Sequence, residues 1–258
     1  MIKSLKIDFW IILGIIFCSV PVILWFRVKP LTSALLFFVI PTIYLFIRRK
    51  KPIKRIFAGS ALIGIGLGFI FDVILSANNA WYELGSQLMF NYRIFGFWPV
   101  DEPIWFILWA LFIIAFYEHF HEREKKGVIS KRFQYLAIPT LIALVFVLCI
   151  FTVRESIFYF RYAYFFLALP SIIPIVLVIK RYPALFIKFF KTGLFFFMLF
   201  LIYELTAVKL GQWYFPGEYI GWIELVGLRF PFEELFFWMM LSNFTVLSLY
   251  EFFVDDSK

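Results

Sequence analysis

The sequence predicts an all-α integral membrane protein with about eight transmembrane helices in two parallel tandem repeats. Three observations lead to this fold class: the composition, a series of long apolar segments, and a spacing that recurs along the chain. Of the 258 residues, 63% are hydrophobic and 16% are charged, well below the roughly 25% charged residues of an ordinary soluble domain. A water-soluble globule could not cover this much apolar surface, and the same composition excludes a disordered chain.

Eight segments are apolar over the length of about 20 residues that a helix needs to cross a bilayer. The first is interpreted as an additional, retained helix within residues 1–28, because Ile23 to Phe26 lack the small residues of a signal-peptide cleavage site. The predicted spans lie near residues 8–26, 31–47, 56–76, 103–120, 133–152, 161–179, 187–208 and 233–252.

Basic residues orient these spans. With the N-terminus on the inner side, 18 of the 25 Lys and Arg residues fall in inner segments and 7 in outer ones. The positive-inside rule therefore predicts a multi-pass protein of the cell membrane with both termini cytoplasmic. On this interpretation the net charge of +8 orients the chain, and its partner is the lipid bilayer with its anionic headgroups rather than nucleic acid.

A single offset of 132 residues links the two halves of the chain. It predicts a first repeat over residues 29–125, a linking helix over 126–157 and a second repeat over 158–258. Parallel repeats place a shared site between them. The offset relates Asp72 to Glu204, Trp81 to Trp213, Tyr82 to Tyr214, Pro99 to Pro231, and Asp101-Glu102 to Glu233-Glu234.

The matched acidic residues form the candidate site. An ionised Asp near the centre of a membrane helix costs about 2.5–3.5 kcal/mol on insertion scales, so such residues usually face a cavity or a partner. Capping of the helix N-terminus alone could explain each acidic pair, but not the additional acid in the preceding helix. A carboxyl group in apolar surroundings can act as a general acid, and aromatic rings stabilise a cation. The pattern indicates acid-initiated chemistry on an apolar polyene or isoprenoid.

Four sequence elements of the second half carry a resemblance to a known family. They are Tyr203-Glu204, the run from Gly211 to Phe215, the run from Pro231 to Phe237, and a closing Tyr250-Glu251. Together they resemble the heterodimer-type lycopene cyclase domain. The first half is similar but departs from the pattern, with Glu83 where the motif has phenylalanine. From about residue 30 to its end the chain thus resembles the fused, two-domain form of these cyclases, and the first helix is additional to it.

The resemblance implies an intramolecular lyase or isomerase that cyclises linear carotenoid ends, as in the conversion of lycopene to γ- or β-carotene. A carboxylic acid would protonate the terminal double bond, and proton loss from the ring cation would complete the isomerisation without cofactor or metal. The resemblance leaves open whether the chain forms homo-oligomers or associates with other carotenoid enzymes. The implied catalytic residues are Glu233 and Glu234 as first candidates for the proton donor, Asp101 and Glu102 as base or equivalent acid, and Asp72 and Glu204 as orienting or relaying groups. The implied substrate-binding residues are Trp81, Tyr82, Trp213, Tyr214 and Phe237.

Two other functions remain open from the residues. Intramembrane carboxyl groups also suit a transporter or a protein that relays protons or cations, and a hydratase would share the carbocation but capture it with water. Ser60, Gly64 and Gly68, four residues apart, predict close packing of one helix against another rather than a dinucleotide site.

Overall fold

The computed structural model describes residues 2–48, 52–122 and 128–255, and it contains eight helical segments long and apolar enough to cross a membrane. Each coincides with one of the predicted spans, so the chain is built as a multi-pass helical membrane protein. Three spans include π-helical turns, where a residue is inserted into the helical repeat. The spans are α1 (Ile2–Phe26); α2 (Pro30–Ala34), a π segment and α3 (Ile40–Arg48); α4 (Ile53–Ser60), a π segment and α5 (Phe69–Ala77); α6 (Asp101–Phe120); α7 (Phe133–Arg154); α8 (Ala163–Ala168) and α9 (Ile172–Arg181); α10 (Leu185–Leu210); and a π segment (Glu234–Leu241), α11 (Ser242–Leu249) and a π segment (Tyr250–Val254).

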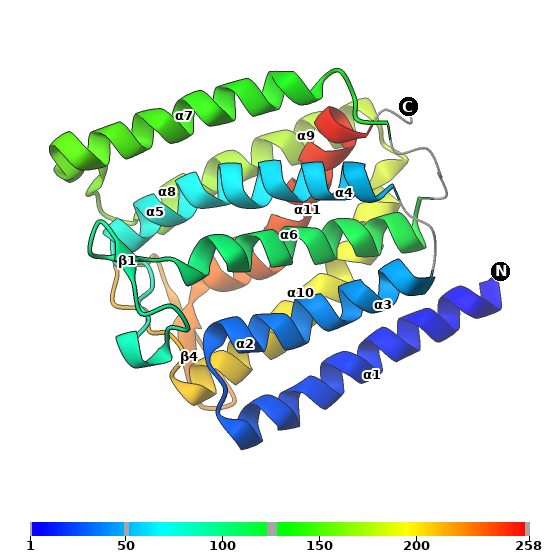
Figure 1. Cartoon of the computed structure of the whole chain (residues 1–258), viewed down its shortest axis with the longest axis horizontal. Coiled ribbons are helices and arrows are strands. Elements are labelled where there is room, and N and C mark those ends of the chain that lie inside the picture. Colours follow the sequence, from blue (N-terminus) through cyan, green and yellow to red (C-terminus); the bar gives the residue numbers. More distant parts are fainter. Residues whose placement is uncertain (1, 49–51, 123–127, 256–258) are drawn as a thin grey trace.

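The helices run roughly side by side as a bundle (Figure 1). In this view α1 and α7 lie at opposite edges, and α6 lies between them. The start of α1 and the end of the last helix lie at one end of the bundle, while the connections that carry β1 (Arg93–Ile94) and β4 (Leu228–Pro231) lie at the other end. We refer to the latter as the loop end and to the former as the terminal end.

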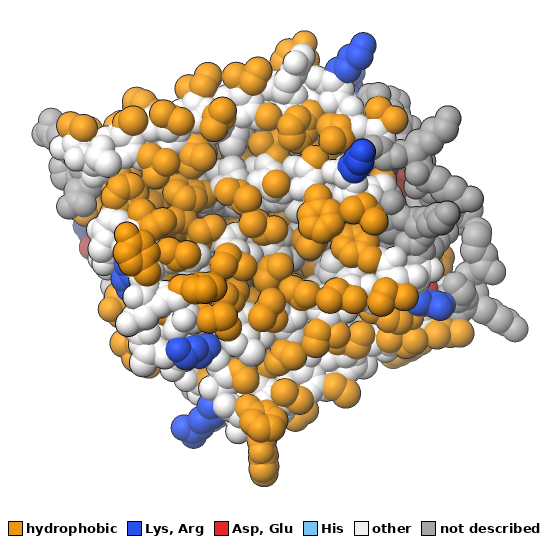
Figure 2. All heavy atoms as spheres, in the orientation of Figure 1, with side chains coloured by type: hydrophobic (Ala, Val, Ile, Leu, Met, Phe, Trp, Pro, Cys, Tyr) orange, Lys and Arg blue, Asp and Glu red, His pale blue; other side chains and the backbone are white. Residues whose placement is uncertain are grey.

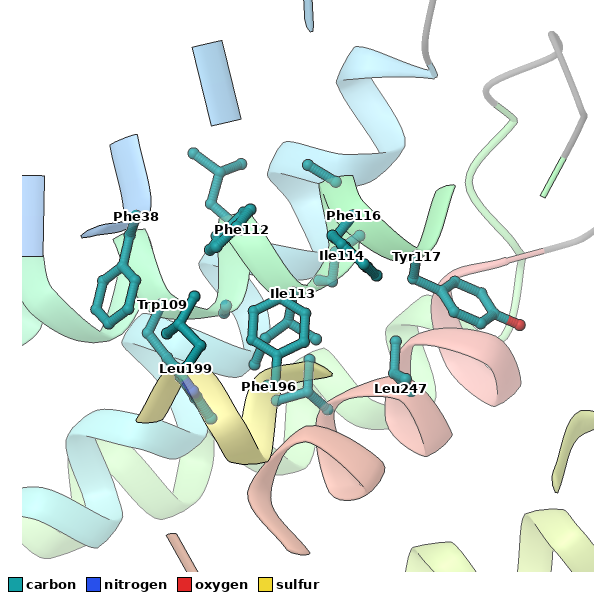
Figure 3. Close-up of a cluster of buried hydrophobic side chains, with 14 of the residues drawn as sticks. Phe38, Trp109, Phe112, Ile113, Ile114, Phe116, Tyr117, Phe196, Leu199 and Leu247 are labelled. Atoms are coloured by element: carbon teal, nitrogen blue, oxygen red, sulfur yellow. The ribbon is translucent and has the colours of Figure 1, made fainter. Parts of the chain in front are cut away.

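Helix α6 forms the centre of the core. Its side chains pack against those of α3, α10 and α11 in one large cluster (Figure 3), in which Phe112, Ile113 and Ile114 are completely buried. Rings from different spans interlock there; for example, the Phe112 and Phe196 rings meet edge to face at 5.1 Å between centroids. Because α6 begins with Asp101 and Glu102, this packing also fixes the position of the first acidic pair.

The prediction of close packing at the small residues of the third span is confirmed. A Cβ atom added to Gly64 would lie 2.6 Å from the backbone oxygen of Phe106, and one added to Gly68 would lie 2.8 Å from the Phe106 ring. The missing side chains allow the backbones of the third span and α6 to approach closely.

The loop end contains two antiparallel hairpins, which the prediction of an all-α fold did not include. β1 pairs with β2 (Trp98–Pro99), and β3 (Trp222–Leu225) pairs with β4. In β3–β4 the two turn residues Val226 and Gly227 have φ of 54° and 72°, as a type I′ turn requires. Each hairpin ends at a proline that precedes an acidic pair, so the hairpins position the starts of α6 and of the last span.

Two reciprocal contacts join the halves of the chain. At the loop end, Tyr82 and Tyr214 form an isolated antiparallel bridge in which each backbone N–H donates to the other residue's carbonyl oxygen, at 2.9 and 3.0 Å. At the terminal end, the hydroxyl of Tyr117 donates to Glu251, and the hydroxyl of Tyr250 donates to Glu118. The first contact links two residues related by the 132-residue offset, and the second links the Tyr of each Tyr-Glu sequence with the Glu of the other.

A buried arginine neutralises part of this terminal-end cluster. The guanidinium of Arg55 is 1% exposed; it donates to Glu118 at 2.7 Å, to the Tyr250 hydroxyl at 3.0 Å, and to Asp255. Nearby, α1 is joined to the bundle through the buried Asp8, whose carboxyl group bonds to Tyr44, Arg48 and His119. The terminal end is therefore closed by paired polar groups.

The outside of the bundle suits a lipid environment. Figure 2 shows hydrophobic side chains over most of one face, with Lys and Arg side chains toward its edges. On α7, Leu141, Ile142 and Phe146 are 60–64% exposed. Such a surface is stable in acyl chains and not in water.

Candidate functional site

A cavity lies near the loop end, where the polar loops meet the helices. It comprises about 620 Å³ of empty space, its open mouth included. Its lining combines four carboxyl groups with aromatic side chains from both halves of the chain. The lining residues are Pro30, Phe71, Trp81, Glu83, Glu102, Trp105, Phe106, Tyr164, Tyr203, Glu204, Trp213, Phe215, Glu234 and Trp238.

The second member of each acidic pair lines this cavity. Glu102 lies in the first turn of α6, and Glu234 begins the last span. Glu102 interacts with the carboxyl group of Glu83, and Glu234 interacts with the side chain of Tyr164. Among the described residues that line the cavity there is no Lys or Arg, so no basic side chain of the lining neutralises these acids.

The first member of each pair has a different neighbour: the backbone of the preceding loop. Asp101 accepts hydrogen bonds from the N–H groups of Met89 and Phe90 at 2.7 and 3.0 Å. Glu233 accepts one from the N–H of Ile220 at 2.7 Å. Neither lines the cavity. Burial raises the pKa of the Glu233 carboxyl, and the Ile220 hydrogen bond acts against that rise. These two acids hold the loops in place.

The acids of the preceding spans each bind an indole. Glu204 in α10 is 2% exposed and accepts a hydrogen bond from Nε1 of Trp213 at 2.9 Å. Asp72 in α5 is completely buried; it accepts one from Nε1 of Trp98 and also interacts with Trp81. Glu204 lines the cavity and Asp72 does not. Both acids therefore hold tryptophan rings in place.

An aromatic wall closes the side of the cavity toward the bundle core. The rings of Trp105 and Trp238 meet at 4.8 Å between centroids, and Trp238 stacks on Phe200 at 4.9 Å. Tyr203 lies 5.6 Å from Trp213 and accepts a hydrogen bond from Nε1 of Trp105 at 2.8 Å. Such ring faces carry partial negative charge and attract a cation.

The predicted substrate-binding residues divide into two groups. Trp81 and Trp213 line the cavity. Tyr82 and Tyr214 do not; their backbones form the bridge between the halves and their side chains are 43% and 48% exposed. Phe237 is buried against Phe165 and Phe236, outside the cavity lining.

Five lining residues with polar or indole groups were not predicted as site residues: Glu83, Trp105, Tyr164, Tyr203 and Trp238. Helical spacing could have indicated two of them, because Trp105 follows Glu102 by three residues and Trp238 follows Glu234 by four, which places each pair on one helix face. Glu83 lies in a loop and Tyr164 in a different span, so no periodicity linked either residue to the acids.

Across residues 2–48, 52–122 and 128–255, no group of three or more His, Cys, Asp or Glu side chains is arranged to hold a metal ion. No protein-family profile, curated protein or solved structure matches the chain. The fold and the site define a multi-pass helical membrane protein with a carboxyl-lined, aromatic cavity.

Proposed function

We propose that the chain is a carotenoid cyclase that converts linear ends of lycopene into ionone rings by acid catalysis. The observation that carries the proposal is the cavity, in which Glu102 and Glu234 lie among tryptophan and tyrosine rings inside an apolar bundle. A general acid and a cation-stabilising wall are the two components that a cyclisation through a carbocation needs. The cavity would hold one end of the polyene at a time.

In this proposal Glu234 is the proton donor. It transfers its proton to C2 of the terminal double bond, which leaves a cation at C1. The C5–C6 double bond attacks C1, forms the ring and moves the cation to C5. The faces of Trp105, Trp213 and Trp238 stabilise these cations, and a second carboxyl group, Glu102, removes a ring proton. The product is an isomer of the substrate, so the reaction consumes no cofactor.

We also propose that residues 29–125 and 158–258 are parallel repeats, related by a two-fold axis along the membrane normal. The reciprocal bridge between Tyr82 and Tyr214 supports this, because a two-fold axis between the halves brings a residue next to its own equivalent. The reciprocal pairs of Tyr117 with Glu251 and of Tyr250 with Glu118 give the same support at the terminal end.

The arrangement in the cell membrane belongs to the same proposal. An even number of spans puts both termini on one side, and the distribution of Lys and Arg assigns that side to the cytoplasm. The cavity then opens near the outer surface. Partners would be the linear carotenoid and the lipid bilayer, with the oligomeric state and association with other carotenoid enzymes left to experiment.

Expression in bacteria that accumulate lycopene tests the proposed activity. The wild-type chain should convert red cells to yellow-orange, and chromatography should detect carotenoids with one or two rings and the mass of lycopene. Carotenoids heavier by one water would indicate a hydratase instead. Unchanged lycopene in cells that contain the folded protein, together with proton or cation flux in liposomes, would contradict the proposal and favour a transporter.

A further inference from the structure

We propose that Glu83 is a further catalytic residue, whose carboxyl group, paired with that of Glu102, takes up the proton that the ring cation releases. This inference rests on the proposed cyclase function and assigns the second half of its acid–base chemistry. It concerns a loop residue that occupies the place of a phenylalanine in the sequence pattern of the second half.

Glu83 is held at the cavity from both sides. It follows Tyr82, whose backbone is bridged to Tyr214. Its own carbonyl oxygen accepts a hydrogen bond from the guanidinium of Arg93, which also donates to the carbonyl of Phe97 at 2.7 Å. Although Glu83 lies in a loop, it is only 5% exposed. The extended backbone here turns successive side chains to opposite sides, and accordingly Tyr82 is exposed while Glu83 lines the cavity.

The partner of Glu83 is another carboxyl group. Glu102 and Glu83 line the same cavity, close enough for each carboxyl group to act electrostatically on the other. Two neighbouring carboxyl groups in apolar surroundings hold one proton between them more favourably than two negative charges. Such a pair with a single shared proton retains one carboxylate, which can accept a proton from a substrate.

The other half of the chain also brings two carboxyl groups to the cavity, Glu204 and Glu234, but Glu204 accepts a hydrogen bond from the indole of Trp213. The residue 132 positions after Glu83 is Phe215, which lines the cavity with an apolar ring. There the acid Glu234 interacts with the phenol of Tyr164 instead. The two halves therefore present different chemistry to one cavity: Glu83 lies beside Glu102 on one side, whereas on the other Glu234 lies beside a phenol and Glu204 is bonded to an indole. This asymmetry favours separate groups for proton donation and proton removal.

The proposed step balances in atoms and electrons. After ring closure the cation is at C5. A carboxylate oxygen of the Glu83–Glu102 pair forms a bond to a hydrogen on C6 or C4, and the electrons of the broken C–H bond form the ring double bond. The choice of hydrogen determines a β or an ε ring. The pair now holds one proton more than before, and it returns that proton to the Glu234 carboxylate across the cavity, which restores the starting state.

The test compares purified wild-type protein with Glu83→Gln in liposomes that contain lycopene. Loss of a general base typically slows a reaction by about 10²–10⁴-fold, so we expect kcat to fall at least about 100-fold with little change in KM. Lycopene deuterated at C4 and C6 should show a larger isotope effect with Glu83→Gln than with the wild type, because deprotonation has become slower. Glu83→Asp, which retains the carboxyl group, should recover a substantial part of the rate.

The matched control is Glu224→Gln, the same change at an exposed residue of the β3–β4 hairpin outside the cavity; it should behave as the wild type. Cyclisation by Glu83→Gln at the wild-type rate, with unchanged ring types and isotope effect, would overturn the inference while the cyclase proposal stands. Equal rate losses in Glu83→Gln and Glu83→Asp, with a lowered melting temperature, would also overturn it by giving Glu83 a structural role. If the wild type itself forms no cyclic carotenoid, the proposed function fails first.

Discussion

Tyr82 and Tyr214 donate backbone hydrogen bonds to each other, at 2.9 and 3.0 Å. Each is the counterpart of the other at the 132-residue offset, and each directly follows a tryptophan that lines the cavity. The bridge thus holds the two loops that carry Trp81 and Trp213 at a fixed separation, with Glu83 next to it in the chain.

Loss of this bridge should destabilise the protein. Tyr214→Pro removes one N–H donor, and the loss of a hydrogen bond between two backbone groups costs about 0.5–1.5 kcal/mol. We expect a lower melting temperature in detergent for this variant. Tyr214→Phe, which keeps the N–H group, should melt like the wild type. Equal melting of the proline variant and the wild type would show that the bridge does not hold the loops together.

The close approach of the third span to α6 predicts a strong effect of a single methyl group. In Gly64→Ala the new Cβ would lie 2.6 Å from the Phe106 carbonyl oxygen, so α6 must shift, at a cost of about 1–3 kcal/mol. Because α6 carries Glu102, catalysis should fall as well. Gly14→Ala in α1, where the added Cβ meets nothing within 4 Å, should be neutral or stabilising by roughly 0.5–1 kcal/mol. Similar melting temperatures for the two variants would contradict this packing.

The polar cluster at the terminal end should affect stability and not chemistry. Tyr250→Phe removes the hydroxyl that donates to Glu118 and accepts from Arg55. Buried charged groups then lose a partner, and the free energy of unfolding should fall by about 1–3 kcal/mol. The turnover of the folded fraction should remain that of the wild type, because the cluster does not line the cavity. Tyr135→Phe, at a position 67% exposed, is the control and should change neither quantity.

The burial of Glu233 predicts that the stability of the protein depends on pH. Burial raises the pKa of Glu233 in the folded protein, so the folded protein is more stable with Glu233 protonated than with Glu233 ionised. The resulting contribution to the free energy of unfolding is lost as the pH rises through the raised pKa. Glutamine cannot ionise and can still accept the Ile220 N–H. The melting temperature of Glu233→Gln minus that of the wild type should therefore increase from pH 5 to pH 8. Glu224→Gln should show no such trend, and a flat or opposite trend for Glu233→Gln would refute the assignment.

Much of the fold could be predicted because hydropathy reports directly on membrane spans. All eight segments were located, and the spacing of Ser60, Gly64 and Gly68 correctly predicted close helix packing. The hairpins could not be predicted, because the turn residues Phe95 and Val226 adopt positive φ without being typical turn formers.

The candidate site was predicted in part. The sequence marked Asp101-Glu102 and Glu233-Glu234 as pairs, but consecutive residues on a helix point about 100° apart. Only the packing of α6 and the last span determines which member faces the cavity. Glu83 was missed for a different reason: a loop residue has no periodicity, and its position depends on the long-range bridge between Tyr82 and Tyr214.

The most direct test of the central claim is cyclisation of lycopene by purified protein in liposomes, measured for the wild type and for Glu234→Gln. The substitution keeps the size of the side chain and removes its acidic proton. We expect the wild type to form ring-containing carotenoids of unchanged mass, and Glu234→Gln to form none while it melts like the wild type and Glu233→Gln remains active. Ring formation by Glu234→Gln at the wild-type rate would contradict the account.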